Sequence, residues 1–366
     1  MRTGHQTWCA YEDSLPCANS LCQILPVLSL SKPVRRVAVV GTGVIGSSWT
    51  ALYLARGLDV VASDPHPGAE AKLRHYVDTA WQALKAMGLS HKGSPEHLSF
   101  DHDPSRAVAQ VDFVQECAPE RVDLKIKLIA ELDAAAPQDA IIASSSASLS
   151  TSVLQSECAR PERCLIGHPF NPPHIVPLVE VVGGQKTSPR AIQEAMAFYK
   201  SIGRRPIHVR KEVLGHVSNR LQAALYREVA YLIEQEVLNV ADADAAVCWG
   251  VGLRWGIMGP NLLFHLGGGE GGIHHFMEHL ARPMAACWKD LGTPDLTPEL
   301  QETIIRGVLK EAGNRSVDQL GKERDELLLG LLRLRSKLTK TLKTPRRSPA
   351  HPTDRRKGPD SRIKPS

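Results

Sequence analysis

The sequence has no apolar run close to the about 20 residues that a membrane-spanning helix needs. Its eight cysteines form no C-x-x-C pair and no His/Cys spacing typical of metal ligands, so neither a zinc site nor a disulfide framework is indicated. Aromatic residues are scarce, at 5%, while hydrophobic residues reach 43%, which is typical of a soluble globular protein. We therefore predict a cytoplasmic protein in a reducing compartment, without a metal ion and without membrane contact.

Positive charge is concentrated at one end of a chain whose formal net charge is +5. Residues 336–366 contain ten Lys or Arg, two Asp and five Pro, but almost no large apolar side chain. Such a segment cannot bury enough surface to offset its ordering entropy, so we predict a basic, disordered tail. Nucleic-acid binding by this tail is the less favoured alternative. Residues 1–33 lack a cleavage site and an Arg-rich composition, and we interpret them as a disordered extension of unknown role.

An apolar strand followed by a glycine-rich turn organises the first half of the chain. Residues 37–40 run into Gly41-x-Gly43-x-x-Gly46 and then into a helix-forming segment, the context typical of a dinucleotide site. Gly41 allows the sharp turn, Gly43 lets the backbone approach a pyrophosphate, and Gly46 lets the helix pack close to the strand. The phosphates would lie on the helix N-terminus. The residues expected to bind the cofactor here are Gly41, Gly43, Val44, Ile45 and Gly46.

Asp64 is the expected partner of the adenosine ribose. It follows the second apolar run, residues 58–62, at the position where a carboxylate accepts both ribose hydroxyls. No arginine follows it to bind a 2′-phosphate, which favours NAD over NADP. The alternative is a turn residue before Pro65.

Strand-like and helix-like segments alternate from Arg35 onward. This pattern predicts a mostly parallel sheet with helices on both faces, an α/β Rossmann-type domain over residues 34–210. From Gly215 nearly every segment has helical periodicity, which predicts an all-α domain for substrate binding and dimerisation over residues 211–335. The predicted strands are 36–41, 58–63, 98–100, 112–117, 140–143, 163–167, 178–182 and 206–209. The main predicted helices are 44–56, 67–87, 121–136, 215–237, 241–249, 297–312 and 316–335.

A histidine and a glutamate form the candidate catalytic pair. A dehydrogenase needs a base near the substrate hydroxyl, and imidazole titrates close to physiological pH. His168 ends one predicted strand and Glu180 lies on the returning strand, where a carboxylate would orient the ring. A purely structural histidine is the alternative. Asn171 and Asn219 are candidates for binding a carbonyl or alkoxide, although each is also compatible with a turn or cap role.

Six motifs together carry a family resemblance. They are GTGVIG (41–46), ECAPE (116–120), ASSSASL (143–149), GHPFNPP (167–173), PLVEVV (177–182) and GHVSNRL (215–221). In this order they resemble the 3-hydroxyacyl-CoA dehydrogenase family over about residues 34–335. The resemblance implies an NAD-binding domain followed by an all-helical domain that forms a homodimer.

The resemblance also implies roles for single residues. The implied catalytic residues are His168, Glu180 and Asn219, and the implied nicotinamide contacts are Glu120, Lys125 and Asn171. One departure from the family pattern concerns a serine that contacts substrate and cofactor. This chain has Ala147 at that position, so Ser146 or Ser148 is expected to bind substrate in its place.

The substrate is indicated by a second set of motifs in the helical region. Residues 252–260 and the glycine run 267–272 resemble L-carnitine dehydrogenases and the related lambda-crystallin type of dehydrogenase. Carnitine is a small 3-hydroxy acid whose quaternary ammonium binds well to an aromatic face and a carboxylate. Trp255, Phe264, Phe276 and Glu270 are the candidates for the cation, and Arg254 for the substrate carboxylate. An ordinary helical core is the alternative for the aromatic residues.

These observations predict an NAD-dependent oxidoreductase that oxidises the 3-hydroxyl of a short acyl-type substrate to a ketone. L-carnitine, converted to 3-dehydrocarnitine, is the leading substrate. A short-chain L-3-hydroxyacyl-CoA of fatty acid metabolism is the alternative, although the segment after the second strand has few cations for the coenzyme A phosphates. A crystallin-like structural or binding protein is a third possibility.

Overall fold

The computed structural model of the protein describes residues 32–343, with side chains to residue 337. The chain divides into two compact units. One comprises the described residues up to Ala80 together with Leu89–Val217, and the other comprises Trp81–Gly88 together with the described residues from Ser218 onward. Residues 1–31 of the predicted extension and most of the predicted tail lie outside the described residues.

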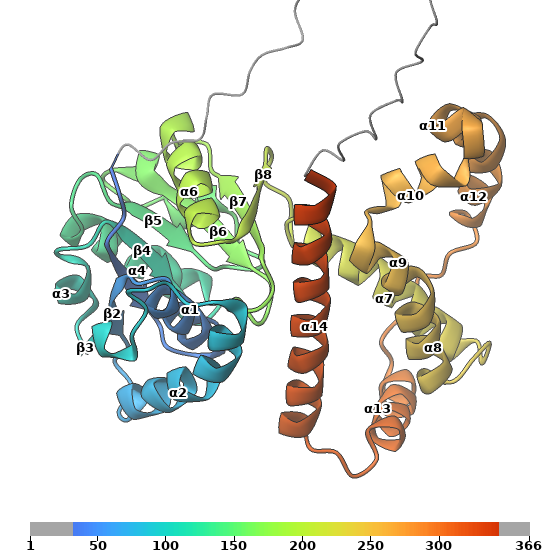
Figure 1. The fold of residues 1–366 in the computed structure, drawn as a ribbon, viewed down its shortest axis with the longest axis horizontal. Helices are drawn as coiled ribbons and strands as arrows, with labels where there is room; N and C mark the ends of the chain where they lie inside the picture. Colours follow the sequence, from blue (N-terminus) through green and yellow to red (C-terminus); the bar gives the residue numbers. More distant parts are fainter. Residues whose placement is uncertain (1–31, 344–366) are drawn as a thin grey trace, which may run out of the picture. The chain divides into compact units, whose positions relative to one another are not determined.

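The first unit contains an eight-stranded sheet in the order β3-β2-β1-β4-β5-β6-β7-β8 (Figure 1). Neighbouring strands are parallel except for the antiparallel pair β6 and β7. The mostly parallel sheet and the helical second unit confirm the predicted fold class. The strands are β1 Arg36–Val40, β2 Asp59–Ser63, β3 Leu98–Asp101, β4 Phe113–Glu116, β5 Ile141–Ser144, β6 Cys164–Pro169, β7 Leu178–Gly183 and β8 Arg205–Val209.

Alternating side chains build a core on each face of this sheet. On one face Val114 packs in a cluster with Leu132 of the helix that follows β4. On the other face Phe113 lies 4.3 Å from Phe198, measured between ring centroids, and Trp49 belongs to the same aromatic group. Both faces are therefore covered by helices, as a parallel sheet requires.

The helices of the first unit include three that the sequence pattern did not predict. These are α3, α5 and α6, and α6 has clear local signals. Ser188 caps it by accepting a hydrogen bond from the Ala191 N–H at 3.1 Å, and Pro189 occupies its first turn. The helices are α1 Val44–Ala55, α2 Ala69–Met87, α3 Pro104–Val108, α4 Val122–Ala135, α5 Thr151–Leu154 and α6 Pro189–Ser201, with 3₁₀ turns η1 Pro95–His97 and η2 Pro161–Arg163.

The second unit is helical throughout its described part. Its core joins Ile233, Val240, Ala243 and Leu300. The elements are α7 Ser218–Glu234, α8 Val240–Ala246, η3 Val247–Val251, α9 Gly252–Ile257, α10 Pro260–Gly267, η4 Gly269–Gly271, α11 Gly272–His275, η5 Phe276–Leu280, α12 Ala281–Cys287, α13 Pro298–Ala312 and α14 Val317–Lys343. Neither this unit nor the described part of the first has a helix that is long and apolar enough to cross a membrane.

The predicted end of the last helix at residue 335 is wrong. Helix α14 continues to Lys343, past the predicted end at 335. Five of the eight residues 336–343 are Leu or Lys, which are good helix formers, and the next proline comes only at position 345. Charge alone therefore did not mark the helix end.

The glycines between β1 and α1 have three different surroundings. Gly41 has a φ of +93°, and a Cβ there would lie 2.6 Å from the backbone of Cys117. A Cβ on Gly46 would overlap the carbonyl oxygen of Gly41. Gly43 has no atom within 4 Å of its Cβ position, and it begins a helix that has neither a side-chain cap nor an acidic residue in its first turn. The N–H groups at this helix end are thus suited to an anion.

These surroundings predict that two alanine substitutions affect the stability of the protein differently. Gly46→Ala should lower the free energy of unfolding by about 1–3 kcal/mol, because the new methyl group meets backbone that cannot move aside. Gly43→Ala is the matched control, which should change this free energy by less than about 0.5 kcal/mol. Urea unfolding followed by circular dichroism measures both, and equal stability of the two variants would contradict the assignment.

Candidate active site

The candidate residues of the first unit lie where strands reach one edge of the sheet. The turn at Gly41 follows β1, Asp64 follows β2, and Glu120 lies in the loop after β4. The segment 145–150 follows β5, and His168 lies near the end of β6. Because parallel strands bring their carboxyl ends to the same edge, residues far apart in sequence meet there.

The antiparallel pair β6 and β7 places His168 directly opposite Glu180. The histidine Nδ1 lies 2.9 Å from the Glu180 Oε2, and both side chains are buried. The other carboxylate oxygen accepts a hydrogen bond from the Val217 N–H at 3.0 Å. A carboxylate only accepts, so Nδ1 carries the shared proton and Nε2 is the basic nitrogen of the neutral ring. The arrangement suits a general base held by a buried carboxylate.

The two amide candidates occupy different parts of the chain. Asn171 is exposed in the loop between β6 and β7. Asn219 lies in the first turn of α7, at the start of the second unit and two positions after Val217 in sequence.

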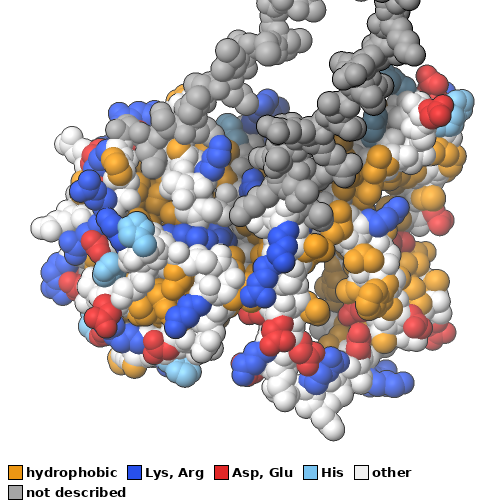
Figure 2. Space-filling model, in the orientation of Figure 1, with side chains coloured by type: hydrophobic (Ala, Val, Ile, Leu, Met, Phe, Trp, Pro, Cys, Tyr) orange, Lys and Arg blue, Asp and Glu red, His pale blue; other side chains and the backbone are white. Residues whose placement is uncertain are grey.

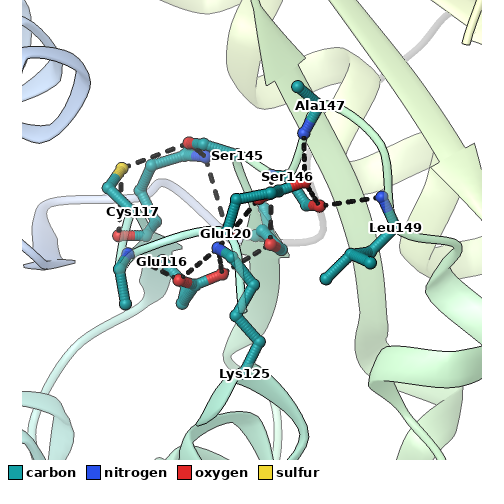
Figure 3. A network of polar contacts seen from close by, with 12 residues as sticks. Glu116, Cys117, Glu120, Lys125, Ser145, Ser146, Ala147 and Leu149 are labelled. Carbon is teal, nitrogen blue, oxygen red and sulfur yellow. Dashed lines mark hydrogen bonds and ion pairs between the residues drawn. The ribbon is translucent and has the colours of Figure 1, made fainter. Parts of the chain in front are cut away.

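Glu120 holds the segment after β5 (Figure 3). Its Oε1 accepts hydrogen bonds from the Ser146 Oγ at 2.5 Å and from the backbone N–H groups of Ala147 and Ser148 at 3.0 and 2.9 Å. Burial opposes ionisation of Glu120, but these hydrogen bonds and the charge of Lys125 outweigh it, so its pKa is lowered. The carboxylate therefore stays ionised and keeps the segment in a fixed position.

The two serines proposed to replace the family serine differ in availability. The Ser146 hydroxyl donates to Glu120 and accepts from the Leu149 N–H at 3.2 Å, and its side chain is buried. Ser148 also donates to Glu120, at 2.9 Å, but it is exposed. Direct substrate binding by Ser146 is thus disfavoured, since its hydroxyl is committed within the protein.

Lys125 is buried and paired with two carboxylates. Its side chain is only 1% exposed, and Nζ lies 2.7 and 2.9 Å from the two oxygens of the buried Glu116. It also lies 3.7 Å from Glu120 (Figure 3). The lysine therefore neutralises the buried carboxylate of Glu116 and stabilises the ionised form of Glu120. Sequence reasoning missed Glu116, although a carboxylate at the very end of a central strand was a usable signal.

Asp64 is bound to the glycine-rich turn. Its Oδ2 accepts from the Thr42 N–H at 2.8 Å and from the Thr42 hydroxyl at 3.0 Å, and its Oδ1 accepts from the His66 N–H at 2.9 Å. Each carboxylate oxygen can accept two hydrogen bonds, so Oδ1 retains capacity for a ribose hydroxyl. Thr42 is a second residue that sequence reasoning missed.

The substrate candidates of the second unit are spread over several short elements. Arg254 and Trp255 lie on α9 and are exposed, as is Glu270 in η4. Phe264 and Phe276 stack on each other with ring centroids 4.5 Å apart, and Phe276 is buried. This stacked pair fits the alternative of an ordinary core, whereas Trp255 and Glu270 are accessible.

Family comparisons cover most of the chain. The model described as 3-hydroxyacyl-CoA dehydrogenase, NAD binding domain, matches residues 36–213, and the corresponding C-terminal domain model matches residues 215–295. An L-carnitine dehydrogenase of Pseudomonas aeruginosa is 45% identical over 305 residues, 83% of this chain and 95% of that protein. One of Bacillus cereus is 42% identical over 304 residues, 83% of this chain and 93% of that protein.

A solved structure with a similar fold is the 5-formyl-3-hydroxy-2-methylpyridine 4-carboxylic acid 5-dehydrogenase, described as an NAD⁺-dependent dismutase. It has a TM-score of 0.71 and 29% identity, covering 83% of this chain and 99% of that chain. The family predicted from the six motifs is therefore confirmed. Matching family models for both parts of the chain, and relatives at 42–45% identity, show that this protein belongs to the 3-hydroxyacyl-CoA dehydrogenase family.

Proposed function

We propose that this protein oxidises the 3-hydroxyl of L-carnitine to a ketone with NAD as hydride acceptor. The buried pair of His168 and Glu180 carries this proposal, because it supplies a base at the sheet edge where the glycine-rich turn also lies. Relatives named L-carnitine dehydrogenase at 42–45% identity support the choice of substrate. The related structure named for a small pyridine carboxylic acid supports a substrate without coenzyme A.

The surroundings of the turn fit NAD. The space in front of Gly43 and the uncapped N-terminus of α1 accommodate a pyrophosphate. Asp64 has acceptor capacity for the adenosine ribose, and the exposed Val44 and the half-buried Ile45 flank the same helix start. Bound NAD supplies the hydride acceptor at the nicotinamide, near which we propose Glu120 and Asn171.

The chain's own part in the reaction is proton transfer and orientation. The His168 Nε2 takes the proton of the substrate hydroxyl as the C–H bond breaks, and Glu180 stabilises the resulting imidazolium. We propose that Asn219 and Ser148 bind the substrate oxygen, and that Arg254 pairs with the substrate carboxylate.

Removal of the base should affect the chemical step and not cofactor binding. His168→Ala should lower kcat by about 10²- to 10⁴-fold, the usual contribution of general-base catalysis. Glu180→Gln should lower kcat as well, because a neutral amide stabilises the imidazolium less. Stopped-flow and steady-state rates with L-carnitine measure both, and NAD binding by calorimetry is the control. Full activity of His168→Ala would remove the histidine from the mechanism.

The charged residues of both units bear on the choice between carnitine and acyl-CoA as substrate. The region after β2 offers few cations for coenzyme A phosphates, and Arg74 is already paired with Glu70 at 2.8 Å. The exposed Trp255 and Glu270 instead suit a quaternary ammonium, through cation–π attraction and charge. The alternative of a short-chain 3-hydroxyacyl-CoA predicts the reverse substrate preference.

A substrate panel separates these alternatives. L-carnitine should exceed 3-hydroxybutyryl-CoA in kcat/KM. Glu270→Gln should raise the KM for carnitine about fivefold, which corresponds to about 1 kcal/mol for an exposed ion pair. The same substitution should not change the KM for an uncharged isostere, in which a tert-butyl group replaces the trimethylammonium group. Glu278→Gln, an exposed change on η5, is the matched control. A preference for the acyl-CoA would favour the alternative, and no turnover of either would favour a crystallin-like binding role.

We propose further that the helical unit forms a homodimer. Several large apolar side chains of this unit are strongly exposed, among them Trp249 at 79%, Trp288 at 64% and Leu327 at 77%. Figure 2 shows hydrophobic side chains gathered on this part of the surface. Exposed apolar area of this kind is typical of a protein–protein contact.

Sedimentation equilibrium tests the dimer directly. The mass should be twice the 40.0 kDa of one chain at micromolar concentration. Leu327→Glu should shift the equilibrium toward monomer by placing a charge on the apolar surface. Val153→Glu, a change to an exposed apolar residue of the first unit, should not. A monomer at every concentration would refute the proposal.

We propose a cytoplasmic location. The Sγ atoms of Cys158 and Cys164 lie 3.8 Å apart as free thiols, well beyond the about 2.05 Å of a disulfide. Thiols this close persist in reduced form in a reducing compartment.

A further inference from the structure

His216 is a second histidine beside the candidate catalytic pair. It lies in the turn before Val217, within the first unit, and only 2% of it is exposed. Its ring centroid is 5.1 Å from that of His168, with an interplanar angle of 49°. None of the roles described so far involves this side chain.

The side chain of His216 is bound to the segment after β5. Its Nε2 lies 2.9 Å from the carbonyl oxygen of Ser146. A carbonyl only accepts, so Nε2 carries a hydrogen, while Nδ1 is buried and has no partner among the described protein atoms. Burial lowers the pKa of His216 and the neighbouring His168 lowers it further, against the Ser146 carbonyl and the carboxylates of Glu180 and Glu120. The ring is therefore neutral near physiological pH.

The turn at His216 leads into a backbone contact with Glu180, made by the next residue, Val217. Gly215 and His216 both have left-handed conformations, with φ of +74° and +51°. Residues other than glycine are uncommon in this region, and histidine and asparagine are among those that adopt it most often. The turn points the next N–H, that of Val217, at the Glu180 Oε1. Two adjacent residues, His216 through its side chain and Val217 through its N–H, thus connect the segment that binds Glu120 with the carboxylate that orients His168.

We propose that His216 is a positioning residue of the catalytic centre. As a neutral histidine it fixes the Ser146 carbonyl, and with it the Glu120 carboxylate, relative to the pair of His168 and Glu180. This inference rests on the proposed dehydrogenase function, but it does not depend on which 3-hydroxy substrate is bound.

Three substitutions separate the side-chain role from the backbone role. His216→Phe should lower kcat with L-carnitine about tenfold, the equivalent of one hydrogen bond, while KM and NAD affinity stay unchanged. His216→Gln should recover activity to within about threefold of wild type, because its amide can reach the Ser146 carbonyl. His216→Asn, which tolerates positive φ but is too short to reach, should remain as slow as the phenylalanine variant. His208→Gln, an exposed change on β8, is the control and should leave the rates unchanged.

Two results would overturn the proposal from these rates. Wild-type kcat in His216→Asn would show that only the turn matters. An ionisation in the acid limb of the wild-type kcat/KM profile that is absent from the His216→Gln profile would show that His216 itself exchanges protons, because a residue that stays neutral contributes no ionisation of its own.

The protonation state gives a test that needs no turnover. Ring ¹⁵N chemical shifts of the full-length protein should show His216 as the neutral Nε2–H form at pH 7.5 and above. A charged ring or the Nδ1–H form would refute the proposal. If wild type turns over 3-hydroxybutyryl-CoA but not carnitine, the proposed substrate fails, and the same variants measured with the acyl-CoA still decide the role of His216.

Discussion

A buried carboxylate imposes the strictest constraint on this structure. Glu180 has no exposed surface, and an unpaired charge in such a position would strongly destabilise the fold. One oxygen is satisfied by His168, which requires the antiparallel register of β6 and β7. The other is satisfied by the Val217 N–H, which requires the left-handed turn at residues 215–216. The need to satisfy one charge therefore fixes both a strand pairing and the exit of the chain toward α7.

Much of the fold could be predicted because its signals are local. The apolar run before Gly41 and the glycine spacing define β1, the turn and α1 within a few residues. Helix α6 was not predicted, although Ser188 and Pro189 mark its start and the predicted strands 178–182 and 206–209 leave room for it. The end of α14 was misplaced because charge was taken as a sign of disorder, whereas the residues concerned are good helix formers.

The site was predictable where strand pairing alone brings residues together. His168 and Glu180 lie on consecutive strands, so their register follows from one hairpin-like connection. The environment of Lys125 could not be predicted, because it depends on Glu116 and Glu120 from other segments and on burial by the whole unit. For the same reason the sequence did not show that the Ser146 hydroxyl is committed within the protein.

The chemistry and the substrate preference fall in different parts of the chain. Oxidation of a secondary alcohol requires a base, a group that orients the base, and a binding site for the hydride acceptor. The residues suited to these three tasks all precede Ser218. These residues cannot distinguish carnitine from an acyl thioester, because both present the same hydroxyl to His168. The two substrates differ only at the end remote from the hydroxyl, which is a compact cation in carnitine and a long polyanion in an acyl-CoA. We therefore propose that residues after Ser218, such as Arg254, Trp255 and Glu270, determine which of the two substrates is preferred.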